Sequence, residues 1–166
     1  MKMISRGDSG EEGLSHVYLH GGRVHVAVEK CLITTIVVSS VAVGLWDIAK
    51  GVGGMNHYML PMAIGGGAAT PRFASTAMND LLEKVFAAGA SRERLRAKIF
   101  GGALHANGEI NSAMLRDLGH RNADVARARL SAEGIPIVEE RLGGNHGRKI
   151  TFRTHDGWSE VMDMSR

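Results

Sequence analysis

Residues 32–45 read LITTIVVSSVAVGL, an almost continuously apolar stretch that is rich in β-branched side chains. Runs of this kind form strands that are covered on both faces, whereas a surface helix keeps a polar side. We therefore expect the centre of the hydrophobic core to lie here.

Shorter segments on either side of this stretch predict further strands. Apolar side chains alternate with polar ones in residues 16–19 and 24–28, which indicates two half-buried strands joined by a turn at Gly21–Gly22. The other expected strands are residues 55–60, 97–100, 135–138, 149–152 and 159–162. Sequential strands can then pair as antiparallel hairpins.

Two segments have the pattern of helices. The first follows Thr70, a suitable N-cap, and Pro71, a suitable first helical residue, and it ends at Gly89. The second is expected at residues 122–133 and ends at Gly134. Because strands outnumber helices, the sequence predicts an α/β (α+β) fold. We expect a single domain in residues 14–166, preceded by a flexible polar tail in residues 1–13.

Composition argues against several classes of protein. No run approaches the roughly 18 apolar residues of a membrane span, and residues 1–10 lack the apolar stretch of a secretory signal, so we expect a cytoplasmic protein. The single cysteine, Cys31, cannot form an internal disulfide. A net charge of +3 with only 5% aromatic residues gives no dense basic and aromatic stripe for nucleic acid.

Thr34, Ser40 and His57 are the candidates for chemistry. Nucleophilic catalysis needs a hydroxyl or thiol, a base within hydrogen-bond reach, and a group that orients the base. The alternative is that Thr34 and Ser40 are ordinary strand residues and that His57 is a hydrogen-bonded histidine at a strand end. Cys31 is a weaker candidate for the nucleophile. The other histidines show no pairing with carboxylates at metal-binding spacing, so we expect no metal and no cofactor.

Two strings carry a family resemblance: GGMNHYMLP at residues 53–61 and KIFGGA at residues 98–103. Matching segments also occur, in the same order, at residues 17–20, 34–36, 41–43, 45–47, 119–122 and 142–149. With these segments the chain resembles the chemoreceptor glutamine deamidase (CheD) family over nearly all of residues 16–157. The resemblance implies a CheD-like fold, with β-sheets in a sandwich flanked by helices, similar to other cysteine hydrolases.

The resemblance also implies an activity. Members of the family convert glutamine to glutamate on methyl-accepting chemoreceptors with a Cys-His-Thr triad. By position, the family's histidine falls on His57, its orienting threonine on Thr34 and its cysteine on Ser40, because the Gly-Ser-Cys stretch reads Val38-Ser39-Ser40 here. A serine must lose its proton during attack, so this exchange should lower the rate on the order of 10³-fold or more. Val38 should add to the loss, because glycine permits backbone conformations and close approaches that valine does not.

Three interpretations follow from these substitutions. The first is a receptor glutamine deamidase weakened by Ser40. The second is an inactive module of the same fold that binds receptors or a CheC-like phosphatase. The third is that a natural cysteine at position 40 was replaced by serine in the laboratory. Val38 argues against this interpretation, because such an experiment would seldom change position 38 as well.

Overall fold

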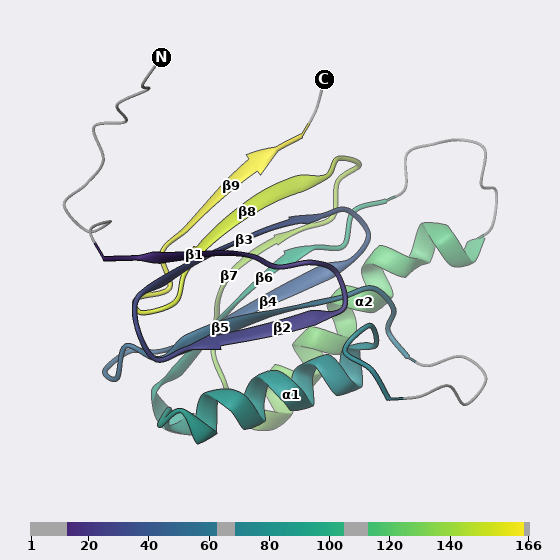
Figure 1. Cartoon of the computed structure of the whole chain (residues 1–166). Coiled ribbons are helices and arrows are strands. Elements are labelled where there is room, and N and C mark those ends of the chain that lie inside the picture. The colour runs from purple at the N-terminus through teal and green to yellow at the C-terminus, as the bar shows by residue number, and fades with distance from the viewer. Residues whose placement is uncertain (1–12, 63–68, 105–112, 165–166) are drawn as a thin grey trace, which may run out of the picture.

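The computed structural model describes residues 13–62, 69–104 and 113–164, with the side chains of α2 described from residue 117 onward. In these ranges the strands form two sheets (Figure 1). The four-stranded sheet has the order β1 (Ser15–Tyr18), β3 (Cys31–Val37), β8 (Arg148–Arg153) and β9 (Ser159–Asp163). The five-stranded sheet has the order β2 (Arg23–Ala27), β5 (Gly53–Tyr58), β4 (Val41–Asp47), β6 (Leu95–Gly101) and β7 (Ile137–Leu142).

The two sheets pack face to face. Ile33 and Phe152 from the four-stranded sheet join Met55 and Phe100 from the five-stranded sheet in one buried cluster. Residues 32–45 supply the central strands β3 and β4, one to each sheet, which confirms the prediction that this stretch lies at the centre of the core.

Two helices, α1 (Ala74–Ala87) and α2 (Ala113–Glu133), cover the other face of the five-stranded sheet (Figure 1). Leu81 of α1 and Leu130 of α2 pack there against Val43 and Leu45 of β4. A short 3-10 helix, η1 (Arg92–Arg94), precedes β6. The α+β prediction is confirmed. Both helices lie on the outer face of the five-stranded sheet, because its inner face packs on the four-stranded sheet.

The pairing of the strands differs from the hairpin prediction in part. Strands β4 and β5, and strands β8 and β9, are antiparallel neighbours as expected. However, β1 and β2 belong to different sheets, so the turn at Gly21–Gly22 joins the two layers and does not close a hairpin. The pairs β1–β3 and β6–β7 are parallel, which makes both sheets mixed.

Both helices also begin elsewhere than predicted. The N-cap of α1 is Phe73, and the buried hydroxyl of Thr70 has no hydrogen-bond partner among the described residues, so Thr70 is not the cap. Helix α2 starts nine residues earlier than expected, at Ala113. The predicted ends near Gly89 and Gly134 are confirmed, because both glycines have the positive φ that commonly follows a helix.

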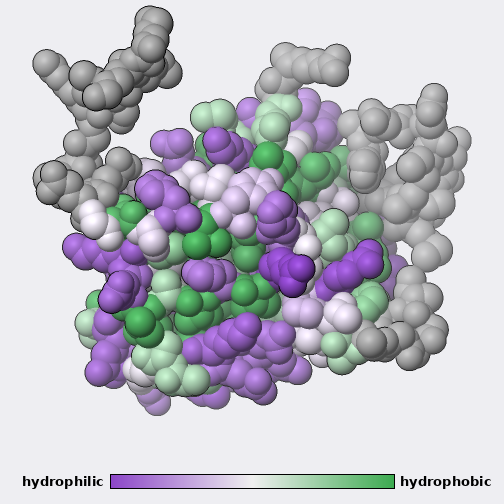
Figure 2. Space-filling model, in the orientation of Figure 1, coloured by the Kyte–Doolittle hydropathy of each residue, from purple (hydrophilic) through white to green (hydrophobic). Residues whose placement is uncertain are grey.

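The surface seen in Figure 2 mixes hydrophobic and hydrophilic side chains, and hydrophobic ones gather over β1 and β2 at the edge of the sandwich. Val17 of β1 and Val24 and Val26 of β2 are partly buried against the two clusters, so this edge is less covered than the helical side. No helix within the described ranges is long and apolar enough to cross a membrane.

Candidate active site

Ser40 lies in the bend that joins the two sheets, between β3 and β4. The end of β6 holds this bend, because Gly102 N–H donates to the Ser40 carbonyl at 3.0 Å and Ala103 N–H donates to the Val38 carbonyl at 2.7 Å. Gly101 has φ +111°, and a Cβ there would lie 2.1 Å from the Ser40 carbonyl oxygen. Gly101 of the KIFGGA string is therefore required where the chain passes the bend.

His57 is in β5, opposite Ala42 of β4. Its side chain is on the same face of the strand as Met55, which lies between the two sheets. The imidazole is 4% exposed, and its Nε2 lies 2.7 Å from Oγ of Ser40, which is 6% exposed. The structure thus brings together two of the three residues that the sequence pattern indicates.

The third position at this site is occupied by Thr35. Its Oγ1 lies 2.9 Å from His57 Nδ1 and donates its only proton to the Leu19 carbonyl at 2.6 Å. Oγ1 must then accept from Nδ1–H, which leaves Nε2 without a proton and able to accept from Ser40. A continuous chain of hydrogen bonds runs from Ser40 through His57 and Thr35 to Leu19.

The structure places Thr35, and not the predicted Thr34, beside the His57 imidazole. Successive side chains of a strand point to opposite faces, so Thr35 shares the inner face with Ile33 and Val37, while Thr34 shares the other face with Ile36. Ile36 is 37% exposed, which shows that this second face does not look into the sandwich.

Burial also determines the charge of the His57 imidazole. Removal from water disfavours the protonated imidazole and lowers the pKa of His57 to about 4, although the Leu19 carbonyl opposes this shift. His57 is therefore neutral at physiological pH, the state in which Nε2 can take a proton.

Comparison with known proteins identifies the family. Residues 59–162 match the sequence profile of the family described as CheD chemotactic sensory transduction. The "Probable chemoreceptor glutamine deamidase CheD" of Trichlorobacter lovleyi is 47% identical over 140 residues, which are 84% of this chain and 85% of that protein. The protein of the same name in Sulfurimonas denitrificans is 39% identical over 84% of this chain and 88% of its own length. "Probable chemoreceptor glutamine deamidase CheD 1" of Anaeromyxobacter dehalogenans is 41% identical over 93% of this chain and 88% of its own length.

The chain belongs to the CheD family. The match to the CheD profile begins at residue 59 and so does not include Ser40, His57 or Thr35. In this CheD chain, the assignment of these three residues to a site rests on their geometry.

Val38 fits the bend of this CheD chain without backbone strain. None of the described residues other than glycine has a positive φ, so Val38 does not adopt the conformation that would favour glycine. A Cβ at Gly147 would lie 3.2 Å from Val38 Cγ2, which shows that the valine methyl is accommodated beside a glycine. The bend therefore needs no positive φ at Val38, while the effect of the valine side chain on substrate approach stays a prediction.

Cys31 lies at the opposite end of β3 from the bend with Ser40, fully buried, with its thiol directed to the Leu32 carbonyl. Its position separates it from His57, so the structure does not bring Cys31 to the candidate site. Within the described ranges, no group of three or more His, Cys, Asp or Glu residues could hold a metal ion.

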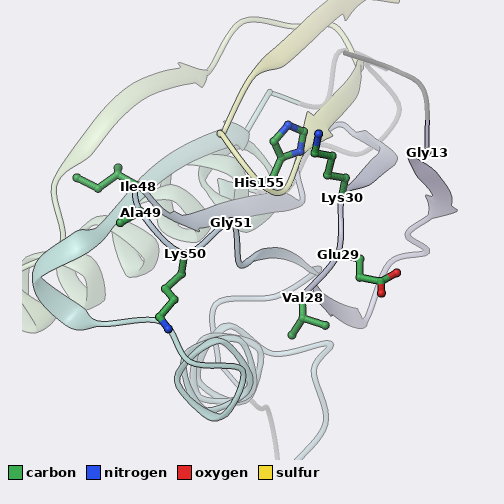
Figure 3. Close-up of a pocket in the computed structure, with 9 residues that line it drawn as sticks. All are labelled: Gly13, Val28, Glu29, Lys30, Ile48, Ala49, Lys50, Gly51 and His155. Atoms are coloured by element: carbon green, nitrogen blue, oxygen red, sulfur yellow. The ribbon is translucent and has the colours of Figure 1, made fainter. Parts of the chain in front are cut away.

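A cavity of about 600 Å³ opens at this same far end of the CheD sandwich (Figure 3). Its walls come from the β2–β3, β4–β5 and β8–β9 connections, with Lys30, Lys50 and His155 among the lining residues. Since Ser40 lies in the β3–β4 bend, this cavity is separate from the hydrogen-bonded chain.

Neither Thr35 nor Asn122 was predicted from the sequence, although the Asn122 side-chain Nδ2 donates to the Ser39 and Met59 carbonyls, close to Ser40 and His57. The alternation of Ile33, Thr35 and Val37 is a usable signal for Thr35, because it places a hydroxyl on the apolar inner face. For Asn122 the sequence indicates the start of a helix and the end of a CheD-like segment, residues 119–122, but no contact at the site. Its contacts depend on how α2 packs against the sheet, for which a single sequence holds no signal.

Proposed function

We propose that this chain is a protein-glutamine deamidase that acts on methyl-accepting chemoreceptors in the cytoplasm. Ser40 is the nucleophile, His57 the base and acid, and Thr35 the residue that orients His57. The observation that supports this proposal is the hydrogen-bonded chain from Ser40 Oγ through His57 to Thr35 Oγ1. The substrate class comes from the relatives, whose names describe probable chemoreceptor glutamine deamidases.

The reaction needs two steps on one serine. His57 Nε2 takes the Ser40 proton while Oγ attacks the side-chain amide carbon of a receptor glutamine. The same proton passes to the amide nitrogen, which leaves as ammonia and yields a glutamyl ester of Ser40. Water, deprotonated by His57, then attacks the ester carbon, the ester bond breaks, and Ser40 Oγ recovers its proton as glutamate is released.

The rate of this reaction should be low. We propose that Ser40 occupies the position of the family's cysteine, and a hydroxyl beside a neutral imidazole of low pKa is a poorer nucleophile than a thiolate. Thr35 is a neutral orienting group, so it stabilises the imidazolium less than the buried aspartate of serine hydrolases does.

A second candidate function rests on the same two features, the hydroxyl of Ser40 and the neutral side chain of Thr35. A CheD-family module without turnover could bind receptors or a CheC-like phosphatase and regulate by occupancy. The hydroxyl at position 40 and the uncharged Thr35 favour it, since neither compensates for the absence of a thiol.

The deciding experiment incubates the purified protein with receptor cytoplasmic fragments and measures both ammonia and the conversion of glutamine to glutamate by mass spectrometry. We expect slow conversion that disappears in the Ser40→Ala variant. No conversion at high protein concentration, together with retained binding in a pull-down, would reject the enzyme in favour of the binding module. Absence of both would reject both.

A further inference from the structure

Asn122 is a fully buried polar residue on α2 that contacts both halves of the candidate site from the helical side. Its side-chain Nδ2 donates to the Ser39 carbonyl and to the Met59 carbonyl, each at 3.0 Å. Ser39 directly precedes Ser40, and Met59 is two residues after His57. One amide group therefore ties the bend that carries the hydroxyl to the end of the strand that carries the base.

The main chain of Asn122 makes a third connection. Tyr58, which directly follows His57, donates its buried hydroxyl to the Asn122 carbonyl. Burial raises the pKa of the Tyr58 hydroxyl well above its usual range, so the hydroxyl stays protonated and remains a donor. Side chain and main chain of one residue thus hold the neighbours of both Ser40 and His57.

The orientation of the Asn122 amide follows from its partners. Both partners are carbonyl acceptors, so the NH₂ group must face them, and the reverse orientation would set three oxygens against one another. The amide oxygen is left buried with no hydrogen-bond partner in the described part of the chain. A buried acceptor without a donor destabilises the fold, so the amide oxygen gives no favourable contact. The favourable contacts of the Asn122 side chain are the two hydrogen bonds of its NH₂ group.

Close approach of the helix makes these contacts possible. Gly119 lies one turn before Asn122, and a Cβ at Gly119 would come within 2.5 Å of the Gly102 carbonyl and 2.6 Å of the Ala103 carbonyl. Gly102 and Ala103 are the residues whose N–H groups hold the bend around Ser40. The absent side chain at Gly119 lets α2 press against this segment, and Asn122 then reaches Ser39 and Met59 on the same helical face.

We infer that Asn122 is a positioning residue, which keeps Ser40 Oγ and His57 Nε2 at their 2.7 Å separation. This inference rests on the proposed function for its effect on catalysis, while its structural part can be tested without the receptor. In the enzyme, removal of the amide should lower kcat about 10²-fold with little change in KM, the size of loss that follows misplacement by about 1 Å.

The test uses the Ser40→Cys variant, in which the new thiol reports on its contact with His57. The rate of alkylation by iodoacetamide is measured against pH, and mass spectrometry separates position 40 from the buried Cys31. Contact with the imidazole should hold the thiol pKa below its ordinary value of about 8.5. Adding Asn122→Ala, or the similarly sized and uncharged Asn122→Leu if the alanine variant does not fold, should return the pKa toward that value.

Leu130→Ala supplies the matched control, because Leu130 is fully buried on the same helix but belongs to the core cluster packed against the sheet. It should destabilise the fold and leave the thiol pKa of Ser40→Cys unchanged. An unchanged thiol pKa in the Asn122 variants would overturn the inference, and so would an equal shift in the Leu130 control or an ordinary pKa in Ser40→Cys alone. If the thiol responds to Asn122 but no receptor is deamidated, the proposed function fails and the positioning role stands.

Discussion

Thr35 Oγ1 lies 2.9 Å from His57 Nδ1, and this contact determines which ring nitrogen can accept a hydrogen bond from Ser40. Because the Thr35 proton is committed to the Leu19 carbonyl, the threonine can only accept from the imidazole. The tautomer of His57 is thus set by a main-chain carbonyl two hydrogen bonds away. Leu19 lies just after β1, so a carbonyl at the edge of the four-stranded sheet fixes the tautomer of a histidine in the five-stranded sheet.

Removing the Thr35 hydroxyl should weaken catalysis without unfolding the protein. Thr35→Val keeps the β-branched shape but leaves Nδ1–H without its acceptor, so we expect kcat to fall about tenfold or more, the equivalent of one buried hydrogen bond. Thr34→Val is the matched control, because Thr34 is on the opposite face of the strand. Equal losses in the two variants would contradict the assignment of Thr35.

Ser40→Cys should raise the rate of deamidation by about 10³-fold, because a thiol beside an imidazole ionises far more readily than a hydroxyl. Glutamine-to-glutamate conversion on receptor fragments provides the measurement. Cys31→Ser should have no effect in either background, since Cys31 lies at the other end of β3. A Ser40→Cys variant that remains inactive would show that more than the nucleophile separates this chain from an active deamidase.

The activity should persist into mildly acidic solution. His57 acts as a base only when neutral, and its pKa of about 4 keeps it neutral throughout the range above pH 5. We expect kcat/KM to be level between about pH 5 and 7 and to fall as the pH drops through about 4. The folded fraction must be followed by circular dichroism over the same range. An acid limb near pH 6.5 would mean that His57 is not buried as described.

The same shift predicts how stability depends on pH. The unfolded chain protonates His57 below pH 6.5 while the folded chain does not until about pH 4, so protons favour unfolding between these values. The free energy of unfolding should therefore fall by up to about 3 kcal/mol more in the parent than in His57→Gln over this window. Urea titrations at pH 7, 5.5 and 4 measure the difference, and parallel curves for the two proteins would refute it.

Gly101→Ala should reduce both stability and deamidation more than the same substitution at Gly89, a glycine with a similar φ far from the site. Gly89 has φ +106°, close to the +111° of Gly101, but a Cβ at Gly89 meets nothing within 4 Å. Gly89→Ala should cost about 1–2 kcal/mol of stability from the backbone alone. Gly101→Ala adds a collision with the Ser40 carbonyl, so it should cost more and should also reduce deamidation per folded molecule. Equal effects of the two changes would contradict the role given to Gly101.

Much of this protein could be predicted from its sequence because the signals are local. The β-branched run at residues 32–45 indicates buried strands through side-chain shape, and Gly89 and Gly134 end helices through their backbone freedom. Ser40 and His57 could be named because a hydroxyl and an imidazole near one strand pair are a possible nucleophile and base. The strings GGMNHYMLP and KIFGGA are contiguous, so the resemblance to CheD needs no knowledge of how distant segments pack.

The tertiary structure decided what depends on contacts between distant segments. Which sheet β1 joins, and where α2 approaches the bend, depend on how apolar faces pack and not on any local pattern. Thr34 and Thr35 are adjacent and chemically identical, and only the direction of the strand's inner face selects Thr35. The sequence by itself thus determined the nucleophile and base candidates, while packing of one sheet on the other determined which threonine lies beside the imidazole.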